Sequence, residues 1–303
     1  MEPGGLLVDE APLTGEGGLV LTPAAPADSG RASRKLGVLF WVSVSWVALI
    51  TLLAVFANLL PMPDPNAVGV ADPGLGPSIH HLLGTDDLGR DLFSRVVFGS
   101  RVSLVVGFFS ILFGMVIGGI LGMIAGFFRG VLDGLISGAA TVLLAFPALV
   151  LAIAVVAFWG PSLFHVTLAI GVLAVAPLTI VVRGNTIRYA EREFVLAARM
   201  LGAKNGRILY RHILANILPA AISLGLVAVP VAIVAEGALS FLGLSVRLPT
   251  ATWGNMIAEG RVIIAQHPLV AFWPSLFLFL TVLALNLAGD RLQRYYNIRE
   301  GGV

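Results

Sequence analysis

The chain has 303 residues, of which 57% are hydrophobic and 12% charged, and its mean hydropathy is +0.94. Soluble domains carry about 25% charged residues, so this composition excludes an ordinary soluble globular enzyme. The net charge of +2 is too small to indicate a nucleic-acid partner. Cysteine is absent and the five histidines lack zinc-type spacings, so we expect no metal site in this chain.

The first 30 residues contain five acidic residues, no Lys or Arg, and many Gly and Pro. Such a segment cannot bury enough apolar surface to fold, which predicts a disordered cytoplasmic tail over residues 1–35. Basic residues then directly precede a 25-residue apolar run, longer than the apolar core of a signal peptide. We therefore expect this run to be retained as a membrane span.

A helix needs about 20 apolar residues to cross the hydrocarbon core of a bilayer, and six uncharged or nearly uncharged runs reach that length. The predicted spans are residues 36–60, 102–128, 135–159, 163–182, 217–244 and 269–289. Gly160-Pro161 predicts a tight turn between the third and fourth spans, because proline cannot continue a helix.

Orientation follows from the basic residues, which collect in cytoplasmic loops. If the N-terminus is cytoplasmic, 14 of the 19 Lys and Arg residues fall on inner segments, which predicts that both termini are cytoplasmic. Residues 61–101 then form an extracytoplasmic loop. Residues 102–303 form the transmembrane core, with 183–216 as its largest inner loop.

The inner loop has apolar residues at helical spacing on both sides of Gly202, which predicts a short helix, a turn and a second helix. The first set is Phe194, Ala197, Ala198 and Leu201, and the second is Ile208, Leu209, His212 and Ile213. From this pattern alone, the loop could also be an amphipathic helix lying on anionic lipid.

Ala197-Ala198 and Gly202, followed by Arg211-His212-Ile213-Leu214, resemble the EAA signature of the membrane subunits of binding-protein-dependent ABC importers. The resemblance implies that this loop is a coupling helix that docks on an ATP-binding subunit. The sequence departs from the signature at Leu196, where Glu is frequent, and at Ala215, where Pro is usual. The coupling residues implied are Leu196, Ala197, Ala198, Arg199, Leu201, Gly202, Ala203, Arg207 and His212.

Three further stretches resemble the second membrane subunit of the dipeptide, oligopeptide and nickel permeases. They are residues 81–104, which contain Leu83-Gly-Thr-Asp and Leu88-Gly-Arg-Asp, residues 236–256, which contain Leu239-Ser-Phe-Leu-Gly-Leu and Trp253-Gly-Asn-Met, and Asn286-Leu-Ala-Gly-Asp290. The resemblance covers about residues 34–298, although Gln293-Arg-Tyr-Tyr-Asn-Ile replaces the usual acidic ending.

This resemblance implies an all-α integral membrane protein of the bacterial inner membrane, with six transmembrane helices and the type I ABC importer permease fold. The implied cargo is a short peptide. The implied partners are a second homologous permease subunit, two ATP-binding subunits or a fused pair, an extracytoplasmic substrate-binding protein and membrane lipid. ATP and Mg would be bound by those partners, so no cofactor is expected in this chain.

Single polar residues leave alternatives open. Glu236 lies within an apolar span, where a carboxylate either fixes helix packing or lines a translocation path or gate. Asp86, Asp87, Arg90 and Asp91 serve either local capping and pairing or, together with Trp253, contact with a binding protein. We expect Asp91 to cap a helix that begins at Leu92.

Catalytic patterns are missing from the sequence. It contains no GxxxxGK[ST] motif and no Ser/His/Asp set at matching depth in the membrane, so we expect a transport subunit rather than an enzyme.

Glycine recurs at every fourth position in the second predicted span, at Gly114, Gly118, Gly122 and Gly126, which predicts close contact with another helix. The alternatives are a nickel or other small-solute permease of the same family, an ion-driven secondary transporter, and a membrane scaffold that does not transport.

Overall fold

The computed structural model describes residues 37–300, and the side chains of residues 37–294. The predicted tail over residues 1–35 lies outside the described residues. Within this range the regular elements are helices, apart from one isolated bridge between Thr85 and Asp91. The predicted all-α architecture is therefore confirmed for the described part of the chain.

Five of the described helical segments are long and apolar enough to cross a membrane. They contain α1 (Gly37–Phe56, followed by the 3-10 turn Ala57–Leu59), α2 (Leu92–Phe128), α5 (Leu163–Ala190), α8 (Ala215–Phe241) and α10 (Leu269–Glu300). The fourth of these segments begins upstream of α8, with α7 (Asn205–Arg207) and a π-helix (Ile208–Leu214).

The predicted third span is not one continuous helix. It consists of α3 (Gly130–Leu144) and α4 (Ala148–Trp159), which meet at an angle of 87°. Pro147 explains the break, because proline lacks an amide hydrogen and restrains the residue before it from helical geometry. The described residues thus provide five spans, or six if this bent pair counts as one.

Helix α2 begins earlier than the span predicted from hydropathy. Asp91 accepts a hydrogen bond from the backbone amide of Ser94 at 2.8 Å, which confirms the predicted cap. Residues 92–101, expected in the extracytoplasmic loop, are therefore helical.

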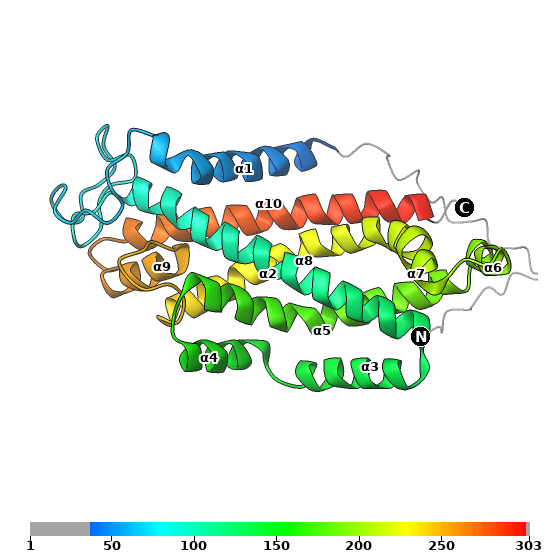
Figure 1. Ribbon diagram of the computed structural model, residues 1–303. Coiled ribbons are helices and arrows are strands. Elements are labelled where there is room, and N and C mark those ends of the chain that lie inside the picture. Colours follow the sequence, from blue (N-terminus) through cyan, green and yellow to red (C-terminus); the bar gives the residue numbers. More distant parts are fainter. Residues whose placement is uncertain (1–36, 301–303) are drawn as a thin grey trace, which may run out of the picture. The chain divides into compact units, whose positions relative to one another are not determined.

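Figure 1 shows the helices running between two ends of the bundle. The loop of residues 60–91 and α9 (Trp253–Val262) lie at one end, and α6 (Glu193–Met200) and α7 lie at the other. We call these the α9 end and the α6 end. The start of α1 and the end of α10 both point toward the α6 end, and α8 runs from the α6 end to the α9 end.

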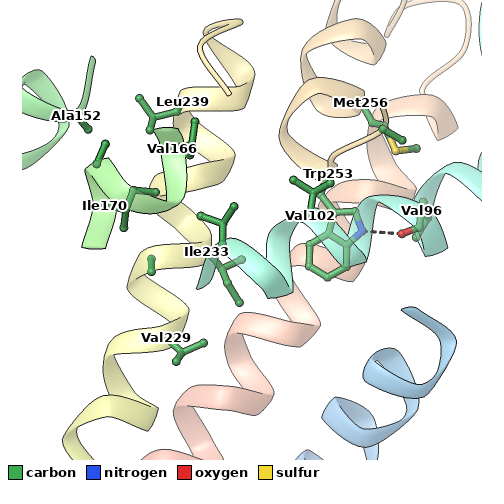
Figure 2. Close-up of a cluster of buried hydrophobic side chains, with 14 of the residues drawn as sticks. Val96, Val102, Ala152, Val166, Ile170, Val229, Ile233, Leu239, Trp253 and Met256 are labelled. Atoms are coloured by element: carbon green, nitrogen blue, oxygen red, sulfur yellow. Dashed lines mark hydrogen bonds between the residues drawn. The ribbon is translucent and has the colours of Figure 1, made fainter. Parts of the chain in front are cut away.

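The main hydrophobic core is built by α1, α2, α4, α5, α8, α9 and α10. Figure 2 shows Trp253 of α9 and Ile233 of α8 among the side chains of this core. The Trp253 side chain is fully buried, and its indole N–H donates a hydrogen bond to the carbonyl of Val96 in α2 at 3.0 Å. A second, smaller cluster at the α6 end joins α2 and α5 to α6 and the π-helix.

Helices α2 and α5 pack closely enough for their backbones to touch. A Cβ atom added at Gly122 would lie 2.6 Å from the carbonyl oxygen of Thr179, and one at Gly118 would lie 2.7 Å from that of Val175. The predicted close contact of this glycine series is confirmed.

The guanidinium group of Arg183 in α5 forms a bidentate ion pair with the carboxylate of Asp133, which connects α3 to α5.

Candidate functional site

The loop at the α6 end has the predicted helix, turn and helix. Helix α6 ends at Met200, and Gly202 has φ +79°, in the left-handed region that favours glycine. A Cβ atom at this position would meet no other atom within 4 Å, so the requirement for glycine is conformational rather than steric.

One face of α6 is anchored and the other is exposed. Val195 is fully buried and Ala198 is nearly so, both in the small cluster at the α6 end. Leu196 and Ala197 are exposed, and Met200 and Leu201 have exposed fractions of 90% and 89%. The sequence pattern missed Val195 as the anchor, because it assigned the apolar face to residues that include Phe194 and Leu201.

The other predicted coupling residues surround this exposed face. Arg199 stacks its guanidinium over the ring of Phe127 at 5.3 Å, which connects α6 to the end of α2. Ala203 packs against the small cluster, and His212 places its ring 6.4 Å from that of Phe194. Arg207 is exposed on α7. The nine residues therefore lie in one loop, divided between an inner anchor and an outward face.

The π-helix Ile208–Leu214 joins this loop to α8. Ile208 and Ile213 are fully buried in the small cluster, so the connection is packed rather than loose. The side-chain amide of Asn216 donates to the carbonyl of His212 at 2.5 Å, which stabilises the junction.

A partly open cavity of about 550 Å³ lies between α4, α5 and α8. Its lining side chains are all apolar, and include Ala152 of α4, Ile170 and Pro177 of α5, and Val231 of α8. The bend between α3 and α4 adds Leu144 and Ala148 to one wall. The break at Pro147 thus contributes directly to the shape of this cavity.

Glu236 does not line the cavity, although its neighbours Val234, Ala235 and Ala238 do. Its side chain is fully buried, and both of its carboxylate oxygens accept hydrogen bonds. The donors are the hydroxyl groups of Ser103 in α2 and of Ser245 after α8, each at 2.9 Å.

A buried charge network holds the α9 end together. Arg90 donates to Asp86 at 2.5 Å and to Glu259 of α9 at 2.8 Å, and Arg95 donates to the same Glu259 oxygen at 3.0 Å. The two arginine side chains are 4% and 0% exposed. Sequence reasoning missed Glu259, because no local pattern joins residues that are more than 160 positions apart.

The residues predicted to contact a binding protein have different surroundings. Four of them are buried, namely Asp86, Arg90, Asp91 and Trp253. The carboxylate of Asp91 lies 2.8 Å from the ring nitrogen Nδ1 of His81. Asp87 is exposed, 4.0 Å from Arg90. Of this set, Asp87 is the residue that faces solvent.

The described residues contain no group of three or more His, Asp or Glu side chains that could hold a metal ion.

Comparisons with known proteins agree with this architecture. Residues 118–300 match the family model described as binding-protein-dependent transport system inner membrane component. The chain is 38% identical over 272 residues to the dipeptide transport system permease protein DppC of Alkalihalophilus pseudofirmus, covering 90% of each chain. It is 40% identical over 249 residues to the glutathione transport system permease protein GsiD of Pectobacterium atrosepticum, covering 82% of this chain and 83% of that one. The chain therefore belongs to the family of binding-protein-dependent transport system inner membrane components, and is a multi-pass permease subunit of an ABC importer in the inner membrane.

Proposed function

We propose that this permease subunit imports short peptides, and that it works with a second homologous permease subunit, ATP-binding subunits and an extracytoplasmic substrate-binding protein. Each permease would form half of the translocation path. ATP and Mg would be bound by the ATP-binding subunits, since this chain has no GxxxxGK[ST] motif.

The observation that carries the proposal is the exposed apolar face of α6. Leu196, Met200 and Leu201 project from a short helix at one end of the bundle while Val195 and Ala198 anchor it from beneath. Exposed apolar residues on a rigid, anchored support are typical of a protein contact surface. Docking of an ATP-binding subunit here would displace α6 and, through the π-helix, α8.

The proposed orientation puts the α6 end in the cytoplasm and the α9 end outside. It is supported by the basic residues, 14 of 19 of which fall on the segments assigned to the inside. The start of α1 and the end of α10 both point toward the α6 end, as expected if both termini are cytoplasmic. The substrate-binding protein would then meet the α9 end, where Asp87 is exposed and the buried charge network keeps the surface rigid.

Peptide cargo is supported by the names of the relatives, which transport dipeptides and glutathione. The apolar cavity fits the role of a path wall, because it holds no charged side chain that would bind one particular ligand tightly. Selection among peptides would then belong to the substrate-binding protein.

The test is uptake by proteoliposomes that contain this chain, its sister permease and the ATP-binding subunits, with the substrate-binding protein added outside. We expect uptake of a labelled dipeptide that requires both ATP and the binding protein. Uptake driven by an ion gradient without ATP would establish a secondary transporter instead. Uptake of nickel but not of the dipeptide would contradict the peptide assignment.

A further inference from the structure

Glu236 is a buried carboxylate that has no role in the proposed docking or in the cavity wall. A charged or polar group at membrane depth is costly unless it is fully hydrogen-bonded, and such residues are retained for a reason. Here both oxygens are engaged by serine hydroxyl groups at 2.9 Å, and the side chain has no exposed surface. Glu236 is therefore closed off from the cavity.

The two serines belong to different elements, so that Glu236 connects three parts of the chain. Ser103 is in α2, and Ser245 is in the segment of residues 242–252 that joins α8 to α9. The same region is held by a hydrogen bond between Ser240 and Thr252. Gly254 of α9 also lies against α8, where an added Cβ atom would collide with the carbonyl oxygen of Gly237.

The hydrogen bonds of Glu236 also affect the cavity, because Glu236 and residues of the cavity wall lie on the same helix, α8. Residues two apart in an α-helix lie about 200° apart around its axis. Val234 and Ala238 therefore face almost the opposite way from Glu236, and both line the cavity. Hydrogen bonds that fix the direction of Glu236 also fix the direction in which this wall of the cavity faces.

The other end of α8, at the α6 end of the bundle, has no such hydrogen bonds to Glu236 and is connected through the π-helix instead. It joins the π-helix, whose buried Ile208 and Ile213 connect it to the α6 loop. A movement of that loop would act on α8 from the α6 end, and the helix would turn as a whole unless its α9 end were held.

We propose that Glu236 is a positioning residue, whose hydrogen bonds to Ser103 and Ser245 hold the α9 end of α8 in a fixed rotation while the α6 end moves. Through this fixed rotation, Val234 and Ala238 stay on the cavity wall throughout the transport cycle. The inference rests on the proposed function, because it treats the cavity as part of the path.

Three sets of variants separate this role from the alternatives. Glu236→Leu removes the hydrogen bonds, and Glu236→Gln keeps a side chain that can still bond to both serines. Ser103→Ala combined with Ser245→Ala removes the donors and keeps the carboxylate. Ser223→Ala is the matched control, because its hydroxyl bonds only within α8, to the carbonyl of Pro219.

Each variant is reconstituted as the full complex, and ATP hydrolysis and dipeptide uptake are measured. We expect Glu236→Leu and the double serine variant to lose uptake by about tenfold or more while ATP hydrolysis continues, since two buried hydrogen bonds together account for about that factor. We expect Glu236→Gln and Ser223→Ala to stay within about twofold of the wild type.

A second readout does not depend on transport. The chain has no cysteine, so that Val234→Cys provides a single reporter on the cavity wall. Its initial rate of labelling by N-ethylmaleimide should change with Glu236→Leu and with the double serine variant, and stay unchanged with Glu236→Gln and Ser223→Ala. Failure of uptake in the wild-type complex would count against the proposed function, whereas the labelling rates test Glu236 by themselves.

Wild-type uptake and labelling in the double serine variant would overturn the proposal. So would a loss of uptake in Glu236→Gln as large as that in Glu236→Leu, because it would show that the ionised carboxylate itself is required. If Glu236→Leu does not assemble, the double serine variant decides.

Discussion

Arg90 and Arg95 show how single side chains stabilise the α9 end. Both guanidinium groups are buried, and both pair with two carboxylates, that of Asp86 and that of Glu259 in α9. A buried ion pair adds little net stability compared with apolar residues, but removing one partner leaves a charge without compensation. The structure therefore makes Glu259 more important than its position near the protein surface suggests.

Replacing Glu259 by Gln should lower the free energy of unfolding by about 3 kcal/mol, because two buried arginines lose a charged acceptor at once. The exposed Asp87, 4.0 Å from Arg90, provides the matched control. Asp87→Asn should change the free energy of unfolding by less than about 1 kcal/mol. The measurement is the midpoint of thermal unfolding of the purified complex. Equal shifts for the two variants would contradict the account of this network.

Gly202 provides a residue-scale test of the α6 loop. Its φ of +79° is strained for a β-branched side chain, and Gly202→Val should cost about 1–3 kcal/mol in the loop alone. That cost is enough to weaken a docking contact by roughly one to two orders of magnitude. Binding-protein-stimulated ATP hydrolysis and uptake should therefore fall together, while the complex still inserts.

Gly202→Asn is the control for this experiment, because asparagine enters the left-handed region more readily than other residues with side chains. It should retain most of the stimulated ATP hydrolysis. A purified Gly202→Val complex with wild-type ATP hydrolysis and uptake would refute the docking assignment and favour a loop that lies on lipid.

At the scale of elements, α2 and α5 pack with their backbones in close contact. Glycine residues on one face of α2 let the backbone of α5 approach to van der Waals distance. In a bilayer, where lipid tails are as apolar as the helices, this close packing is itself a main source of helix association.

Gly122→Val should separate α2 from α5, because its added Cβ would lie 2.6 Å from the carbonyl oxygen of Thr179. Overpacking of this kind costs about 1–3 kcal/mol or more. Gly119→Val is a matched control on the same helix, since a Cβ there would meet nothing within 4 Å. We expect a lower unfolding midpoint for Gly122→Val and little change for Gly119→Val. Similar midpoints would show that the contact is less tight than described.

The elements also show what the sequence could and could not predict. Hydropathy and length located the main apolar helices, Asp91 marked the start of α2, and Gly202 marked the turn of the inner loop, because each of these signals is local. The 87° bend was missed, although Pro147 was visible, since an apolar run of sufficient length suggested one span. The pairing of Glu259 with Arg95 depends on the tertiary fold and has no local signal.

At the scale of the whole molecule, two differently built ends are joined by α8. The α9 end contains a buried charge network, the fully buried Trp253 and the hydrogen bonds of Glu236. The α6 end presents exposed Met200 and Leu201 on an anchored helix. In the proposed function, the α6 end would meet the ATP-binding subunit and the α9 end would meet the substrate-binding protein.

The central claim is that the α6 end docks the ATP-binding subunit, and site-specific cross-linking in the assembled complex tests it most directly. Leu201→Cys, at a position 89% exposed, and Ile79→Cys, at a position 90% exposed on the loop of the α9 end, are each treated with a short cross-linker. We predict that Leu201→Cys links to the ATP-binding subunit and that Ile79→Cys does not. A link to that subunit from Ile79→Cys, with none from Leu201→Cys, would contradict both the docking surface and the orientation.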